Sequence, residues 1–85
     1  MNEITVDCCG LETKARLHAA LADGLHFPDW YGHNLDALYD CLTDLDEPVH
    51  LHLAGWQQLP EWKAGFASVF DDAENDCMNL IISYE

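Results

Sequence analysis

Basic residues are nearly absent from this sequence. Its 85 residues include 3 Lys plus Arg against 16 Asp plus Glu, which gives a formal net charge of −13 with the 5 His neutral. A domain this acidic is repelled by nucleic acid and by anionic membrane surfaces, even if every His is protonated. The composition therefore argues against both as partners and favours a basic protein or a cation.

Segments that would direct the chain into a membrane are also missing. The N-terminus, MNEITVDCC, has neither the basic segment nor the apolar run of a signal peptide, and no stretch approaches the ~20 apolar residues of a membrane span. The cysteines lack the C-x-x-C spacing of zinc or redox sites. We therefore expect a cytoplasmic protein with reduced thiols, each a small buried hydrophobic side chain. These cysteines are Cys8, Cys9, Cys41 and Cys77.

The length and the hydrophobic content, 49%, suffice for one small core, so we expect a single domain over residues 1–85. Strands separated by helices predict an α/β fold with a small parallel sheet and helices packed against it. The first predicted elements are a strand over 3–8, a helix from the N-cap Thr13 to about Ala22 ended by Gly24, and a loop and helix within 27–45. They are followed by a strand over 49–53, a helix from Pro60 to about Asn75, and a strand over 78–84 buried on both faces.

The segment FPDWYGHNLDALYDCLTDL, residues 27–45, carries the strongest signal. It begins as a loop around Trp30 and continues as a helix for which Asn34 is the predicted N-cap. At ~100° per residue, two faces separate: one carries Leu35, Leu38, Leu42 and Leu45, and the other carries Asp36, Asp40 and Asp44. Like charges at this spacing cost the helix a few tenths of a kcal/mol per pair. No Lys or Arg between Leu17 and Trp62 compensates them, so folding alone does not explain the arrangement.

Two chemical interpretations of the polar residues are weak. His50 and His52 alternate along a predicted strand, so one metal ion could reach both, but the sequence assigns no third ligand and exposed strand-face histidines are favoured. The aspartates could serve as acid–base groups or as ligands for Mg²⁺ or Ca²⁺. However, the sequence has no Gly-rich phosphate loop, no G-x-S-x-G and no EF-hand spacing. We therefore predict that the protein is not an enzyme and has no cofactor.

A solvated helix face is the ordinary explanation of a charge run. Two features argue for a binding surface instead: the lack of compensating bases, and the aromatic and hydroxyl side chains of Tyr39 and Thr43 beside the acids. Aromatic anchors beside charges are typical of protein-binding hot spots. The residues alone leave both interpretations open.

The segment PDWYGHNLDALYDCLTDL closely resembles the signature of the barstar family, intracellular protein inhibitors of small secreted ribonucleases of the barnase type. The resemblance is strongest over residues 27–43, where it has no gap, and an uninterrupted YG-x-NLDAL-x-DCLT is highly specific. It implies a three-stranded parallel sheet flanked by three to four helices, in agreement with the element order above.

The resemblance also implies a mechanism, a 1:1 blockade of a basic barnase-like ribonuclease by a protein that is monomeric when free. The helix and the loop before it enter the cationic cleft of the enzyme, where the carboxylate of Asp40 takes a phosphate-binding position and Asp36 supplies a second acid. The residues expected to meet the partner are Trp30, Asn34, Leu35, Asp36, Tyr39, Asp40, Thr43, Asp44 and Asp72.

Several positions depart from the family pattern. Trp30 replaces a tyrosine, Tyr39 replaces a tryptophan, and Asp72 replaces a glutamate. Asp44 and Leu45 stand in place of a glycine and a tryptophan. These changes fall at and near the expected contact edge, so the cognate ribonuclease stays open. The alternatives are an acidic binding module for a different basic partner, for example a non-ribonuclease toxin, and a metal-dependent enzyme.

Overall fold

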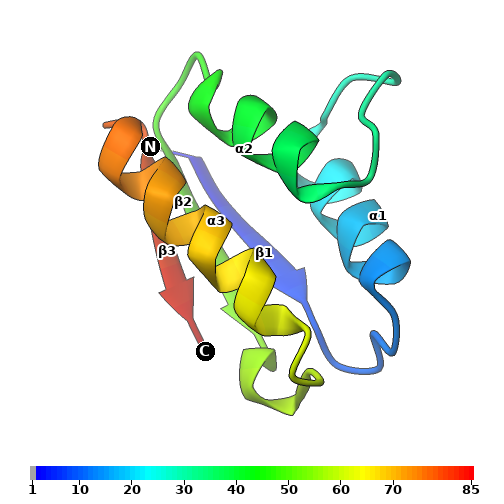
Figure 1. Ribbon diagram of the computed structural model, residues 1–85. Helices are drawn as coiled ribbons and strands as arrows, with labels where there is room; N and C mark the ends of the chain where they lie inside the picture. The colour runs from blue at the N-terminus through cyan, green and yellow to red at the C-terminus, as the bar shows by residue number, and fades with distance from the viewer. Residues whose placement is uncertain (1) are drawn as a thin grey trace.

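Figure 1 shows the computed structural model, which describes residues 2–85. The elements are β1 (Asn2–Asp7), α1 (Lys14–Leu25), α2 (Leu35–Thr43), β2 (Val49–Ala54), the 3₁₀ turn η1 (Trp56–Gln58), α3 (Lys63–Asp76) and β3 (Leu80–Tyr84). The strands form one parallel sheet in the order β1-β2-β3. The predicted α/β fold with a three-stranded parallel sheet is therefore confirmed. None of the helices within residues 2–85 combines the length and the apolar character needed to cross a membrane.

The helices pack on one face of the sheet. Both crossover connections add the next strand in the same direction, and right-handed crossovers of this kind bring their helices to the same side. Figure 1 shows α3 across the β2–β3 side of the sheet and α1 beside β1, in agreement with the contacts of these elements. Along β2, Val49, Leu51 and Leu53 are buried, whereas His50 and His52 are half-buried on the opposite face. We call this second face, which no helix of residues 2–85 covers, the open face.

The three helices are joined in one core by pairs of side chains four residues apart. Each pair is fully or almost fully buried: Leu17 and Leu21 from α1, Leu38 and Leu42 from α2, Phe66 and Phe70 from α3. A four-residue spacing places both members of a pair on the same helix face. Truncation of such a side chain to Ala typically costs about 2–5 kcal/mol of stability. The leucines of α2 thus fix this helix to the rest of the domain.

The ends of two helices differ from the sequence prediction. Gly24 does not end α1, because the helix continues to Leu25 and His26 is its left-handed C-cap with φ 56°. A Cβ at Gly24 would lie 3.3 Å from a Val6 methyl group, so this glycine allows α1 to approach β1 closely. Pro60 is not the first residue of α3 either. It begins a turn in which its carbonyl accepts a hydrogen bond from the amide of Lys63, the first residue of the helix, at 3.1 Å.

The final strand is shorter and more exposed than predicted. The prediction placed a strand over 78–84 with both faces buried, but β3 begins at Leu80 and its burial alternates. Leu80 and Ile82 point into the core, whereas Ile81 is 43% exposed. The physical reason is the open face, since a continuous apolar run is fully buried only where both faces of a sheet are covered.

Candidate partner-binding site

The start of α2 is fixed by Asn34, as predicted. The Oδ1 atom of Asn34 accepts a hydrogen bond from the amide of Ala37 at 2.8 Å, and its Nδ2 donates to the carbonyl of Gly32 at 3.2 Å. The side chain therefore satisfies an amide of the first helical turn and also holds the preceding loop. His33, between them, has the left-handed φ of 52°. Asn34 is thus committed to the geometry of the loop and helix, whatever it contacts in a partner.

The two predicted faces of α2 are present. Leu38 and Leu42 are buried, whereas Asp36 and Asp40 are exposed and Asp44 is the exposed C-cap. Asp36 lies in the first turn, where the helix dipole favours an anion, and Asp44 lies at the end that disfavours one. Among residues 2–85, no Lys or Arg forms an ion pair with these carboxylates. Their charges therefore remain available to an external cation.

Leu35 and Thr43 at the two ends of α2 contact their own chain. The side chain of Leu35 is half-buried and faces Gly65 of α3, where a Cβ would lie 3.2 Å from Leu35 Cδ1. The absence of a side chain at Gly65 therefore lets α2 and α3 approach each other. The hydroxyl of Thr43 donates to the carbonyl of Tyr39 at 2.9 Å, within the helix. Contact of either residue with a partner remains a prediction.

Tyr39 connects α2 to the end of α3. Its hydroxyl donates a hydrogen bond to the carboxylate of Asp76. This hydrogen bond is the main reason why the pKa of Tyr39 is raised, with smaller contributions from burial and from the charges of Asp76, Asp72 and Asp40. The predicted residue Asp72 therefore lies in the same electrostatic environment as the α2 acids. We call the surface formed by Asp36, Asp40, Asp44, Asp72 and Asp76 the acidic face.

Asp76 is a member of the acidic face that the sequence analysis missed. It follows Asp72 by four residues on α3, so the helical period alone could have placed it on the same side. Its hydrogen bond to Tyr39 could not have been foreseen, because it depends on how α2 and α3 pack. Asp76 holds the aromatic ring at the edge of the acids and also adds a charge.

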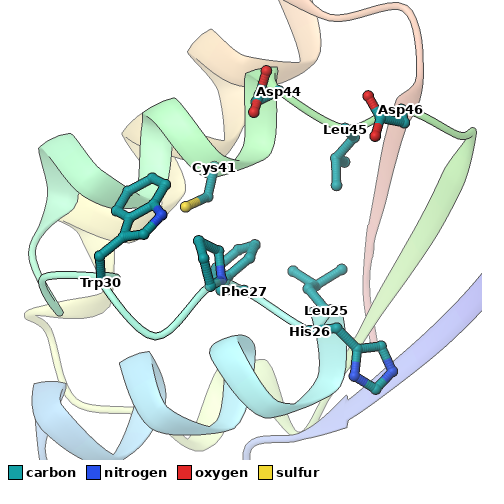
Figure 2. A pocket seen from close by; sticks show the side chains of 9 residues that line it. Leu25, His26, Phe27, Trp30, Cys41, Asp44, Leu45 and Asp46 are labelled. Atoms are coloured by element: carbon teal, nitrogen blue, oxygen red, sulfur yellow. The ribbon is translucent and has the colours of Figure 1, made fainter.

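Trp30 is the most exposed aromatic side chain of the loop before α2, with 70% of its surface accessible. It borders a hollow of about 260 Å³ between this loop and α2 (Figure 2). Figure 2 shows Trp30 at the left of the hollow, Cys41 on α2 above it, and Phe27 and Leu25 below. Two acids lie on its rim, Asp44 at the end of α2 and Asp46 in the segment after the helix. The hollow thus has apolar side chains in part of its lining, although most of its accessible lining is polar, and two acids at its edge.

Two buried side chains, also missed by the sequence analysis, form a hydrogen bond that anchors the loop before α2 to α1. The Nδ1 atom of His18 in α1 lies 2.6 Å from the hydroxyl of Tyr31, and both side chains are buried. The His18 ring also packs on Phe66 of α3, with centroids 4.7 Å apart. Burial lowers the pKa of His18, and the nearby His33 lowers it further, which favours the neutral ring. Burial likewise raises the pKa of Tyr31 and keeps its hydroxyl protonated.

The prediction that every cysteine is buried is correct for three of the four. Cys8, Cys41 and Cys77 are buried, and burial, followed by the charge of Asp7, raises the pKa of the Cys8 thiol to about 11. Cys9 is exposed, because it follows β1 in the turn that leads to Gly10. Its thiol also has a raised pKa, chiefly through a hydrogen bond to Asp7. Cys8 and Cys9 thus lack the lowered pKa of a reactive nucleophile.

Comparison with known proteins places this fold and site in a family. The profile of the family described as Barstar (barnase inhibitor) matches residues 1–81. The chain belongs to the barstar family. Barstar proteins are described as inhibitors, which agrees with the prediction that this chain is not an enzyme.

The chain is also similar to a curated protein named as a ribonuclease inhibitor. A protein of Bacillus subtilis (strain 168) named "Putative ribonuclease inhibitor YrdF" is 45% identical over 60 residues. The match covers 71% of this chain and 54% of the relative, so the chain spans about half the length of the curated relative it matches.

Proposed function

We propose that this protein inhibits a small basic ribonuclease by covering its active site, in a 1:1 complex, with α2 and the loop before it. The observation that carries the proposal is the acidic face, in which aspartates of α2 and α3 gather around Tyr39 in a chain of the barstar family. A ribonuclease must hold the phosphates of RNA with cationic side chains, so its cleft is complementary in charge to this surface.

Asp40 is the carboxylate expected to take the place of an RNA phosphate. It is exposed near the middle of α2, next to Tyr39 in the sequence, and the family resemblance assigns it this position. A desolvated carboxylate that meets several cationic donors makes short, charge-assisted hydrogen bonds. Asp36 supports it from one turn earlier in the helix. Asp44, at the end of the helix, would lie at the rim of the interface.

Trp30 and the hollow beside it would extend the interface. Large exposed aromatic side chains often form the energetic centre of a protein interface, because they bury much area at a small entropic cost. The apolar side chains in part of the lining suit the methylene groups of a long basic side chain, and the acids at the rim suit its charged end. We therefore expect a Lys or Arg of the ribonuclease to enter it.

Three hydrogen bonds prepare this surface before the partner arrives. Asn34 caps α2, Tyr31 is held by His18 beneath the loop, and Tyr39 is held by Asp76. Ordering an interface residue on binding costs about 0.5–1.5 kcal/mol for each side chain that must be immobilised. A preformed loop and helix avoid part of this cost, which favours tight inhibition.

The proposal is tested by titrating the protein against a panel of small basic ribonucleases while RNA cleavage is followed. We expect cleavage by at least one of them to disappear at one inhibitor per enzyme. Asp40→Asn removes the proposed phosphate mimic, and Glu61→Gln is the matched control because Glu61 is an exposed acid in the turn before α3. Asp40→Asn should abolish the stoichiometric endpoint, and Glu61→Gln should preserve it.

Two outcomes would contradict the proposal. If no ribonuclease in a broad panel is inhibited while a basic protein without ribonuclease activity binds, the alternative of a different basic partner is correct. If inhibition occurs and Asp40→Asn inhibits as well as the unchanged protein, the enzyme is bound through another surface.

A further inference from the structure

The open face of the sheet gathers three side chains that can bind a metal ion. Glu3 of β1 lies opposite His50 of β2 in the strand register, and His52 follows two residues later on the same face. One donor atom from each of these three side chains lies within 4.8 Å of the other two. The sequence alone identified His50 and His52 as a possible pair of ligands but no third one. The pairing of β1 with β2 places Glu3 beside them as the third candidate ligand.

Two imidazole nitrogens face the same carboxylate oxygen. His52 Nε2 lies 3.1 Å from Glu3 Oε1, and His50 Nδ1 lies 3.9 Å from it. The two rings are stacked, with centroids 4.0 Å apart. Ligand atoms of a tetrahedral zinc ion lie about 3.3 Å apart, because the bonds are about 2.0–2.1 Å long. Small side-chain rotations would therefore bring all three donors to one ion.

The other nitrogen of each ring is held by a partner on β3 or just beyond it. His50 Nε2 lies 2.7 Å from the hydroxyl of Ser83, and His52 Nδ1 forms a hydrogen bond with Glu85. Metal-binding histidines usually donate their second N–H to such an outer group, which fixes the ring and its tautomer. A neutral imidazole has only one N–H, whereas a protonated one can donate to Glu85 and to Glu3 together, and both hydrogen bonds raise the pKa of His52. A metal ion bound to Nε2 and to Glu3 would take the place of the proton between them.

We propose that Glu3, His50 and His52 form a binding site for a divalent transition-metal ion, with Glu85 and Ser83 as the outer groups that orient the two rings. Two imidazoles and one carboxylate are a donor set suited to Zn²⁺ and its neighbours, whereas Mg²⁺ and Ca²⁺ take oxygen ligands. Glu3 is exposed, so an ion can enter from solvent and water can complete its coordination. The net charge of −13 also concentrates cations around the chain.

This site is independent of the proposed ribonuclease interface. It lies on the open face, whereas α2 packs against α3, which lies on the opposite face of the sheet. Failure of either proposal therefore leaves the other untouched. Zinc binding should leave ribonuclease inhibition unchanged.

Calorimetric titration of the chelator-treated full chain with ZnSO₄ tests the site. We expect one ion per chain. We expect Glu3→Gln to weaken its binding at least about tenfold, because loss of even an outer group of a metal site typically costs that much. His52→Gln should have at least the same effect. Glu85→Gln removes an outer group only, so it should weaken affinity about 10–100-fold and leave the stoichiometry at one.

Two matched substitutions control for nonspecific attraction to an acidic protein. Glu12→Gln removes an exposed acid from the loop before α1, and His26→Asn removes an exposed histidine while keeping a residue that tolerates its left-handed backbone. Both variants should bind zinc as the unchanged protein does. Glu3 is exposed, so Glu3→Gln is expected to fold, and an unfolded His52→Gln would leave the test to the Glu3 and Glu85 variants.

Cobalt substitution identifies the ligands. Co²⁺ at the proposed site should show the visible bands of low-coordinate cobalt without the near-ultraviolet charge-transfer band of a thiolate. A thiolate band would show that the exposed Cys9 holds the ion and would overturn the proposal. Equal zinc affinities for the unchanged protein and for Glu3→Gln would also overturn it, because the three groups would then form only a network between histidines and carboxylates.

Discussion

The individual aspartates of α2 differ in how much binding free energy each is expected to contribute. Asp40 is expected to be desolvated against several cations of the enzyme, and loss of one partner of such a group leaves buried cations unpaired. Asp44 is the exposed C-cap of the helix, and rim charges contribute about 1 kcal/mol or less. We therefore predict that Asp40→Ala weakens inhibition by several kcal/mol, on the order of 100- to 10,000-fold, and Asp44→Ala by less than about tenfold. Inhibition constants for both variants provide the measurement.

The same two substitutions make a prediction for the free protein. Each removes a repelling neighbour from the row of three aspartates, and Asp44→Ala also removes an anion from the negative end of the helix dipole. Urea midpoints should therefore be unchanged or slightly higher than that of the unchanged protein. A lower midpoint for Asp40→Ala would mean that Asp40 supports the fold, and its effect on inhibition would then need another explanation.

At the scale of elements, the loop before α2 depends on a neutral His18 in α1. The pKa of His18 is lowered in the folded protein by burial and by His33, and its other ring neighbours, Tyr31 and Phe66, carry no charge near neutral pH. Below pH about 6.5, His18 becomes protonated in the unfolded chain, whereas in the folded chain it becomes protonated only at lower pH. The contribution of His18 is therefore complete above this pH, and it is lost as the pH falls toward the lowered pKa.

We predict that stability falls with decreasing pH below about 6.5, by at most about 1.4 kcal/mol per pH unit from this group. His18→Gln keeps a polar side chain near Tyr31 but does not titrate. The difference in unfolding free energy between the unchanged protein and His18→Gln should therefore shrink as the pH falls. Urea unfolding of both proteins at several pH values measures this difference. A difference that stays constant from pH 7 to about pH 5 would show that His18 does not carry the effect.

Elements with a clear hydrophobic period were predictable, and so was a helix start with a side-chain cap, whereas helix ends that depend on tertiary contacts were not. The leucine and aspartate faces of α2 follow from the helical period, and the cap at Asn34 follows from side-chain chemistry, so both could be predicted locally. The end of α1 depends on the close approach of Gly24 to Val6 in β1, a tertiary contact that overrides the preference of glycine for helix ends.

The same distinction applies to the candidate site. The acids of α2 and Trp30 were identified from the sequence and its resemblance, because they lie in one continuous segment. The links from Asp76 to Tyr39 and from Tyr31 to His18 join residues 37 and 13 positions apart, and they arise only when the helices pack. Glu3 was overlooked beside the two histidines because the strand pairing that brings it there joins the first strand to the second.

At the scale of the whole molecule, the net charge of −13 should govern how fast a basic partner associates. Electrostatic steering raises association rates about 10- to 1,000-fold, and salt screens it. This behaviour is known for the barnase–barstar pair, from which we borrow the expectation. We predict that the association rate with a cognate ribonuclease falls steeply from low to near-molar salt, whereas the dissociation rate changes much less. Stopped-flow fluorescence measures both.

A charge-reduced variant controls this measurement. Asp36→Asn combined with Asp72→Asn removes one acid from each helix of the acidic face. Its association should be slower than that of the unchanged protein at low salt, and the two rates should converge at high salt. Association rates that do not change with salt would exclude steering.

The small sheet has a further consequence for how copies of this chain meet one another. β1 and β3 are its outer strands, and an outer strand presents unpaired amides and carbonyls that another chain can extend into a larger sheet. The exposed Ile81 of β3 would add apolar contact area to such an association. Each copy, however, carries the same strong negative charge, so two copies repel before their edges can pair. The charge that would draw in a basic enzyme thus also protects the free protein from aggregation, and concentrated salt or acid would weaken that protection.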